Sequence, residues 1–301
     1  FATKHSGLRH RKMALTKRVA VVTGSNKGIG FAIVRGLCKQ FDGDVYLTAR
    51  DESRGMKAVE DLKKEGLNPL FHQLDISDPT STQNLKTFLR KQYGGLDVLI
   101  NNAAIADMTE VLSFYGITQK GDISYAKQAE NTMKVNVWDT LAVCDALFPL
   151  LHPHARVVNI SSEASTMIYP KCSEAIKCRI RDPDITMDQF KKLFREFEAA
   201  VTSDTVEEKG WAKVAYGVSK IAVRVMSYIQ GKDFTKDTKR PDIIVNSCCP
   251  GDVDTDMTDH RGIKSIDEGA ETPLYLALLP PNVMGPRGEF VKDKQIEQWP
   301  V

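Results

Sequence analysis

The sequence predicts an α/β protein built on one doubly wound parallel sheet of about seven strands, with helices on both faces. Short runs rich in Val, Ile and Leu, typical of strands buried on both faces, alternate along the chain with polar, helix-forming stretches. The first of these runs leads into a glycine-rich turn and then into a helix pattern. The chain has 301 residues, 42% of them hydrophobic, and no Pro/Gly/Ser-rich linker. A single domain over residues 14–301 is therefore expected.

The first strand, turn and helix have the pattern of a phosphate-binding unit. A β-branched run, Arg18–Thr23, is followed by Gly24-Ser-Asn-Lys-Gly28-Ile-Gly30 and by a helix pattern at Phe31–Leu37. Glycines permit a tight turn and a close backbone approach, and helix N-terminal amides bind a pyrophosphate. The alternative is a glycine-rich connector without a ligand. The residues expected to bind a dinucleotide here are Gly24, Asn26, Lys27, Gly28, Ile29 and Gly30.

The end of the second strand indicates which dinucleotide binds. The strand Asp44–Thr48 is followed by Arg50, at the position where such folds face the adenosine ribose. An acid there favours NAD and an arginine favours a 2′-phosphate. Arg50, Arg54 and Lys27 therefore favour NADP, although Asp51 could still reach a ribose. The alternative is that both arginines are only solvated surface charges.

Later strands end in polar residues that belong to the same edge of the sheet. The runs Pro69–Asp75, Leu96–Asn101 and Arg156–Ser162 repeat the buried-strand profile. Ligands bind at the carboxyl ends of strands in such sheets, which makes Asp75, Asn102 and Ser162 candidate site residues.

A tyrosine and a lysine four positions apart supply the expected acid chemistry. Tyr216 and Lys220 open a helix that continues through Ile221–Ile229, so the two side chains share one face. A nearby ammonium favours the phenolate and lowers a phenol pKa of about 10. Tyr216 would then donate a proton to a carbonyl under reduction. Asn136, in a helix segment at Met133–Trp138, could hold a water beside Lys220.

These motifs occur in the order used by the short-chain dehydrogenase/reductase superfamily, a Rossmann-type fold. They are Gly24/Gly28/Gly30, Asn101-Asn102-Ala103, Asn136, Ser162, Tyr216/Lys220 and Pro250-Gly251-x-Val253-x-Thr255. More narrowly, the chain resembles the animal monomeric NADPH-dependent carbonyl reductases over residues 17–299. The runs that carry this closer resemblance include Thr48–Asp51, Phe71–Ile76, Tyr93–Leu99, Cys248–Gly251 and Tyr275–Pro281.

The resemblance implies a role for each matching residue. Tyr216 would be the proton donor, Lys220 would lower its pKa and hold the nicotinamide ribose, and Ser162 would orient the carbonyl. Asn136 would complete a water-linked proton relay. The implied cofactor contacts are Lys27, Arg50 and Arg54 at the adenosine phosphate, Asp75 at the adenine, Asn102 and Val253 beside the nicotinamide, and Pro250, Gly251 and Thr255 in the adjoining turn.

The resemblance implies hydride transfer from NADPH to a ketone, aldehyde or quinone, with a small-molecule carbonyl as the only partner. The alternatives are an alcohol or steroid dehydrogenase of the same superfamily, which Arg50 disfavours, and a non-catalytic NADP-binding sensor. Three departures from the closer relatives concern the pocket. Ala104 replaces a glycine, Asp252 replaces a tryptophan that lines the substrate site, and the stretch Asp107–Gln128 is longer.

An insert of about residues 165–212 precedes the catalytic tyrosine. Ser162 and Tyr216 are 54 positions apart, against about a dozen in most of the superfamily. Within the insert, Thr186–Gln189 has the pattern of a helix start, and apolar residues follow at helical spacing. They are Phe190, Leu193, Phe194, Phe197 and Val201. They would dock the insert on the sheet's neighbours, and the insert could also act as a lid. The resemblance associates such an insert with a monomer.

Composition excludes other partners. Residues 1–13 form a basic tail, expected to be disordered or to be added or upstream sequence, and without its four basic residues the net charge of +2 becomes −2. Nothing indicates a nucleic-acid surface, and no apolar run is long enough to span a membrane. Six scattered cysteines indicate thiols, a cytoplasmic protein and no metal site. Cys249, at the cofactor edge, is either an accessible thiol or a small buried side chain.

Overall fold

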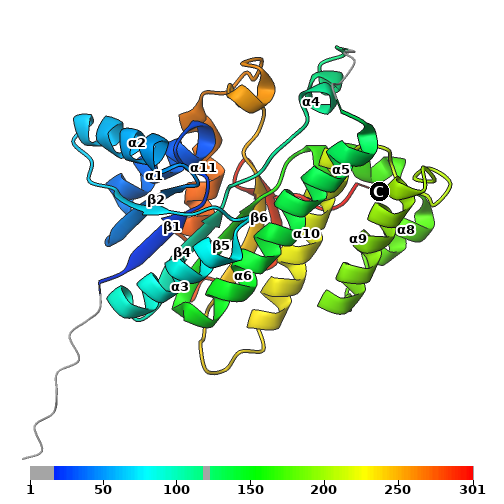
Figure 1. The fold of residues 1–301 in the computed structure, drawn as a ribbon. Coiled ribbons are helices and arrows are strands. Elements are labelled where there is room, and N and C mark those ends of the chain that lie inside the picture. The colour runs from blue at the N-terminus through cyan, green and yellow to red at the C-terminus, as the bar shows by residue number, and fades with distance from the viewer. Residues whose placement is uncertain (1–16, 118–122, 301) are drawn as a thin grey trace, which may run out of the picture.

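The computed structural model describes residues 17–117 and 123–300, and its centre is one sheet (Figure 1). In the described residues the sheet has eight strands in the order β3-β2-β1-β4-β5-β6-β7-β8. All neighbours pair in parallel except β7 and the two-residue β8. The expected parallel sheet of about seven strands is confirmed, with β8 as a short antiparallel addition. The strands are β1 Val19–Val22, β2 Asp44–Ala49, β3 Leu70–Gln73, β4 Leu96–Asn101, β5 Leu151–Ile160, β6 Ile244–Cys249, β7 Phe290–Lys292 and β8 Gln295–Ile296.

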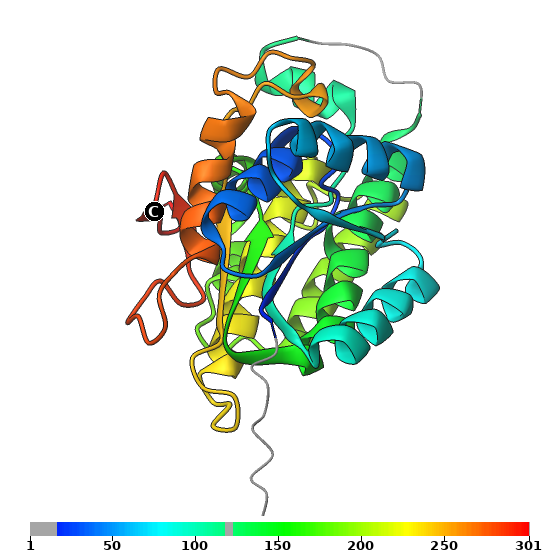
Figure 2. The ribbon, with the colours of Figure 1, turned by 90° about the vertical axis from the view of Figure 1, so that its left-hand side faces the viewer.

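Helices cover both faces of the sheet, as the sequence predicts. The α-helices of the described residues are α1 Gly28–Gln40, α2 Glu52–Lys64, α3 Pro79–Tyr93, α4 Met108–Phe114, α5 Tyr125–Met133, α6 Thr140–Leu147, α7 Ala164–Ile168, α8 Glu174–Ile180, α9 Met187–Thr202, α10 Ala215–Phe234 and α11 Ile266–Ala277. Shorter helical turns are the π-helix η1 Lys134–Asp139 and the 3₁₀ turns η2 Phe148–Leu150, η3 Tyr169–Lys171 and η4 Asp256–Thr258. Helices α1, α2 and α11 pack on one face, and α3, α6 and α10 pack on the other (Figures 1 and 2).

The strand order reverses between β1 and β4, and this reversal creates a binding position. Both strands are buried along their whole length, because helices cover both of their faces. The chain leaves β1 and β4 toward opposite sides of the sheet. Ligands bind outside the carboxyl ends of strands at such a switch point. The glycine turn after β1 and the segment after β4 meet there.

The insert before Tyr216 forms a helical layer outside α10 (Figure 1). Thr186 caps α9, and a reciprocal contact with Gln189 completes the capping box that the sequence predicts. The apolar residues predicted at helical spacing on α9 are all buried in a cluster that also contains α10 side chains. The docking interpretation is therefore confirmed, and the lid interpretation stays a prediction.

Two expectations lie wholly or partly outside the described residues. The basic tail of residues 1–13 lies outside them. So does part of the long stretch Asp107–Gln128, because residues 118–122 are not described. The rest of that stretch contains α4 and the start of α5. Among the described residues, no helix has the length and apolar character needed to cross a membrane.

Candidate active site

A cleft of about 620 Å³ opens at the switch point, and we call it the main cleft. It contains eleven of the sixteen residues predicted to bind the cofactor: Gly24, Asn26, Lys27, Gly28, Ile29, Gly30, Arg50, Arg54, Asp75, Asn102 and Thr255. Ala104, where the resemblance expects a glycine, also lines it. The other five, which do not line it, belong to α10 and to the turn after β6. They are Tyr216, Lys220, Pro250, Gly251 and Val253.

Hydrogen bonds join the two loops of the switch point. The Thr23 hydroxyl accepts the N–H groups of Asn102 and Ala103, each at 3.0 Å. The Asn102 amide in turn donates to the carbonyls of Thr23 and Gly24, at 3.1 and 2.9 Å. Asn102 therefore shapes the glycine turn itself, whereas the sequence predicted a contact with the nicotinamide.

The glycine turn needs its glycines for two separate reasons. Gly24 and Gly28 have φ values of +59° and +57°, a region that side chains with a Cβ atom rarely adopt. A Cβ atom on Gly30 would lie 2.5 Å from the Asn102 amide nitrogen. Helix α1 begins at Gly28, and Lys27 before it makes no side-chain cap, so its first N–H groups suit an anion.

Charged side chains surround the outer part of the main cleft. Arg50 and Arg54 are exposed, and Arg54 lies 3.5 Å from Asp51. Lys27 forms an ion pair with Asp256 in η4. His260 bonds to Asp254 at 2.7 Å and lies 3.3 Å from Asp256, and the bond to Asp254 raises the pKa of the imidazole. A phosphate would compete with Asp256 for Lys27.

The catalytic candidates lie beside the main cleft, where Tyr216 contacts Met257 of its lining. Ser162 follows β5, and its hydroxyl accepts the N–H of Ala164 at 3.1 Å. Burial raises the phenol pKa of Tyr216, and the nearby Ser162 side chain partly opposes that rise. The Tyr216 hydroxyl also lies 3.8 Å from the sulfur of Met257, which lines the main cleft. The Lys220 ammonium donates to the carbonyl of Ile160 at 2.9 Å and lies 5.5 Å from the centre of the Tyr216 ring.

Burial, rather than the lysine charge, dominates the ionisation of this pair. It raises the pKa of Tyr216 to about 12, and it lowers the pKa of Lys220 to about 8. Both groups are withdrawn from water, and the ammonium is directed at the Ile160 carbonyl. The expected lowering of the Tyr216 pKa by Lys220 stays a prediction.

Asn136 lies in the π-helix η1, where the sequence predicted an ordinary helix segment. Its side chain is bound to protein groups: it accepts from the N–H of Ile105 and donates to the Ile105 carbonyl, each at 2.8 Å, and donates to Ser219 at 3.1 Å. It therefore fixes the segment after β4 against α10, and the water relay stays a prediction.

The structure adds residues that the sequence pattern did not reveal. Glu110 of α4 binds the first two N–H groups of α10, including that of Tyr216. Tyr115, just after α4, donates to Asp252. Each of these contacts joins residues more than a hundred positions apart, so no local spacing could indicate it.

Cys249 is not an accessible thiol. It is buried, and its sulfur accepts the N–H groups of Glu163 at 3.1 Å and Gly251 at 3.2 Å. Burial raises the pKa of this thiol to about 11. Of the two alternatives for Cys249, the buried side chain is therefore confirmed.

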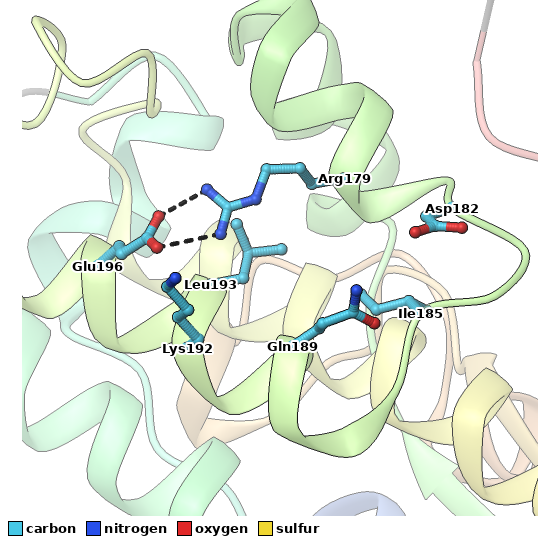
Figure 3. A pocket seen from close by; sticks show the side chains of 7 residues that line it. All are labelled: Arg179, Asp182, Ile185, Gln189, Lys192, Leu193 and Glu196. Carbon is cyan, nitrogen blue, oxygen red and sulfur yellow. Dashed lines mark hydrogen bonds and ion pairs between the residues drawn. The ribbon is translucent and has the colours of Figure 1, made fainter.

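A second, smaller cavity of about 440 Å³ lies on the insert between α8 and α9 (Figure 3). Arg179 and Glu196 face each other across it and form two hydrogen bonds, at 2.6 and 3.1 Å. The carboxylate neutralises the cavity's arginine, and none of the predicted site residues lines this cavity.

The fold and the main cleft define a doubly wound α/β protein with a nucleotide-type site at its switch point. A family model described as short chain dehydrogenase matches residues 18–174. Carbonyl reductase (NADPH) 1 from Bos taurus is 48% identical over 287 residues, which cover 95% of this chain and 100% of the relative. Carbonyl reductase (NADPH) 3 from Rattus norvegicus is 46% identical over the same shares of both chains.

Solved structures agree with this relationship. The structure of salutaridine reductase from Papaver somniferum has a TM-score of 0.78 and 30% identity, covering 92% of this chain and 100% of its own. The chain belongs to the short-chain dehydrogenase family.

Proposed function

We propose that this protein is an NADPH-dependent carbonyl reductase that converts ketones, aldehydes or quinones to alcohols. The observation that carries the proposal is the grouping of Ser162, Tyr216 and Lys220 beside a cleft that is lined by basic side chains. The near-full-length identity to carbonyl reductases supports the same activity.

The main cleft fits NADPH. The N-terminus of α1 and the glycine turn suit the pyrophosphate, and Lys27, Arg50 and Arg54 suit a 2′-phosphate. Bound NADPH would supply the hydride. Asp75 is half-buried in the same cleft, with one carboxylate oxygen accepting the Ser77 N–H at 2.9 Å. We assign it, with Thr255 and the Pro250–Val253 turn, to cofactor binding.

The chain's own residues would bind and protonate the substrate. Because its pKa is about 12, the Tyr216 phenol holds its proton at neutral pH and can donate it to the developing alkoxide. Ser162, whose side chain lies close enough to Tyr216 to influence the phenol pKa, would orient the carbonyl oxygen. Lys220 would compensate the negative charge that forms on Tyr216 when the phenol gives up its proton. Its pKa of about 8 keeps its ammonium mostly protonated at neutral pH.

We also propose that the protein is a monomer and is cytoplasmic. Helices α7 and α9 of the insert pack against α10, and the superfamily's dimers use the helix after the catalytic tyrosine. Insert side chains therefore occupy surface that a dimer would need. All six cysteines are free thiols, which suits a reducing compartment.

The test is NADPH oxidation against a panel of carbonyls, with NADH in parallel. We expect turnover with NADPH well above that with NADH, and Tyr216→Phe should lower kcat by at least about a hundredfold, the usual scale of a lost general acid. NADPH binding, followed by fluorescence, should stay within about twofold. Tyr228→Phe is the matched control, because this exposed tyrosine lies at the other end of α10 and donates to Pro183.

Each other outcome identifies an alternative. A faster reaction in the direction of alcohol oxidation would favour an alcohol or steroid dehydrogenase. Tight NADPH binding without turnover of any carbonyl would favour the non-catalytic sensor. A Tyr216→Phe rate near that of the native protein would mean that another group donates the proton.

A further inference from the structure

The chain after β6 folds back beside the glycine turn, and we call its residues 254–263 the η4 segment. The two ends of this segment are joined: the Asp254 N–H donates to the Lys264 carbonyl at 2.8 Å, and the Lys264 N–H donates to the Asp252 carbonyl at 2.9 Å. A Cβ atom on Gly28 would lie 3.4 Å from the Thr255 methyl group. The η4 segment therefore lies against the first residue of α1.

Local hydrogen bonds fix the position of Asp256 at the start of η4. Thr255 and Thr258 form a capping box around this turn, and the His260 N–H donates to the Thr255 carbonyl at 3.0 Å. One oxygen of the Asp256 carboxylate pairs with the Lys27 ammonium, and the other lies 3.3 Å from the His260 imidazole. Lys27 lowers the pKa of this carboxyl group, so Asp256 is ionised at neutral pH.

This ion pair occupies a group that NADPH needs. Lys27 and Asp256 both line the main cleft, and Lys27 directly precedes the first turn of α1. A phosphate monoester carries a charge of about −1.5 to −2 at neutral pH. If Asp256 stays in place when this phosphate binds, two anions share one ammonium and repel each other. If Asp256 leaves, its ion pair with Lys27 is lost. Either event weakens NADPH binding, whereas NADH has no 2′-phosphate and leaves the pair intact.

The other charges of the main cleft do not make this effect negligible. The charged side chains that line it are three permanent cations, four acids and one imidazole: Lys27, Arg50, Arg54, Asp51, Asp75, Asp254, Asp256 and His260. Next to them, Asp259 lies 3.5 Å from Arg261, and Lys264 lies 2.7 Å from Asp293. Each of these two pairs has no net charge. Acids and cations thus nearly balance, so the removal of one acid should favour a phosphate.

We propose that Asp256 is a specificity-determining residue, which competes with the 2′-phosphate of NADPH for Lys27 and so limits the preference for NADPH over NADH. This inference rests on the proposed function, because it assumes that NADPH occupies the main cleft. Lys27 pairs with Asp256 in the free protein and with the phosphate in the complex. NADP⁺ carries the same phosphate, so Asp256 also favours the release of the oxidised cofactor.

The test is calorimetric measurement of cofactor binding to the full-length protein. Asp256→Asn should bind NADPH about three- to tenfold more tightly, the scale of one exposed ion pair together with one screened repulsion. The dissociation constant of NADH should change by less than about twofold. The fragments 2′,5′-ADP and 5′-AMP differ only in the 2′-phosphate, and they should repeat the difference between NADPH and NADH. That result would assign the effect to the phosphate.

A second variant distinguishes competition for Lys27 from repulsion alone. Lys27→Met should weaken the binding of NADPH more than that of NADH. In this variant the gain from Asp256→Asn should shrink to less than about twofold, because no ammonium remains to compete for. Asp184→Asn is the matched control, since it breaks an exposed pair with Lys232 outside the cleft and should leave all four ligand affinities unchanged. Thermal unfolding verifies that each variant is folded.

The outcomes separate this proposal from the proposed function. An unchanged NADPH affinity in Asp256→Asn, or an equal gain for NADPH and NADH, would overturn the role of Asp256 in specificity. An equal gain with and without Lys27 would show repulsion alone and would overturn the competition. Carbonyl turnover by the native protein is measured separately. Phosphate-specific gains without turnover of any carbonyl would support the competition and overturn the reductase function.

Discussion

At the scale of single residues, Lys220 is a buried ammonium with one carbonyl for a partner. Its contact with Ile160 compensates only part of the hydration it has lost, so its pKa falls to about 8. The same burial raises that of Tyr216 to about 12. The two shifts keep the phenol protonated and make the ammonium a stronger acid. At neutral pH the Tyr216 phenol, which is the group expected to donate a proton, is therefore protonated.

The depressed pKa of Lys220 predicts a pH-dependent stability. The unfolded lysine binds its proton near pH 10.5 and the folded one near pH 8, so between these values the unfolded state binds more protons. Stability from this group is therefore present above about pH 10.5 and is lost as the pH falls to about 8. Lys220→Met should remove that loss. When the pH is lowered from 10.5 to 8, the free energy of unfolding of the native protein should fall by about 3 kcal/mol more than that of the variant.

Urea unfolding of both proteins at several pH values measures this difference. The other titrating groups are common to both proteins and cancel in it. Lys63→Met, which alters an exposed lysine of α2, should leave the pH dependence of the native protein unchanged. Parallel pH profiles for the native protein and Lys220→Met would show that Lys220 titrates normally.

Candidate site residues could be found from the sequence where their local spacing forms a pattern. Tyr216 and Lys220 share a helix, and Ser162 ends a strand, so their pattern is visible in the chain itself. Their pKa values were not predictable, because depth of burial is a property of the packed protein. Asn102 was found for its place at a strand end, but its contacts with Thr23 and Gly24 give it a structural role as well.

At the scale of elements, α10 depends on a cap supplied from another part of the chain. Glu110→Ala would leave two N–H groups at the helix start without this partner, and one of them belongs to Tyr216. Each unsatisfied N–H group costs about 1–3 kcal/mol when it is buried. Because these hydrogen bonds are only partly buried, we expect the free energy of unfolding to fall by about 2 kcal/mol. We also expect kcat to fall several-fold, because the first turn of α10 positions the phenol.

Denaturant unfolding and steady-state kinetics together test this cap. Thr186→Ala removes the cap of α9, and should cost about 1 kcal/mol without changing kcat. Glu110→Gln keeps one acceptor oxygen and should recover part of both losses. An unchanged kcat in a destabilised Glu110→Ala protein would limit Glu110 to a structural role.

Elements were predictable where their own residues specify them. The capping box of Thr186 and Gln189 and the spacing of apolar residues predicted α9 correctly. The π-helix at Asn136 was expected as an ordinary helix, because the same apolar spacing suits both. Asp252 and the long stretch after β4 were each noted as departures, but the bond between Tyr115 and Asp252 spans 137 positions. Only the folded chain brings them together.

At the scale of the whole molecule, the insert is a segment that covers α10 and whose two ends lie close together. The Ser173 N–H, near one end, donates to the Gly210 carbonyl, near the other, at 2.8 Å. Between them, Phe190, Phe194 and Phe197 are 0% exposed, in a cluster that includes α10. Aromatic side chains bury about 150–250 Å² each. Removing these three would thus uncover apolar surface comparable to the largest patch that monomers normally expose, about 300–600 Å².

This geometry predicts how the insert controls assembly. The native protein should sediment as a monomer near 33.5 kDa at every concentration. Deleting residues 174–209 and joining Ser173 to Gly210 should expose the covered face of α10, and the variant should associate to at least twice its own chain mass. Sedimentation velocity over a range of concentrations measures both. Arg179→Ala combined with Glu196→Ala is the control, since it removes only an ion pair at the insert's outer cavity.

The two halves of this prediction can fail separately. A native protein near twice 33.5 kDa would show that pairing uses a surface the insert leaves open. A deletion variant that folds and stays monomeric would show that the face of α10 does not drive association once it is uncovered. If both halves hold, the same aromatic packing that docks the insert also keeps the molecule monomeric, because the surface that pairs in the superfamily's dimers is already filled by its own chain.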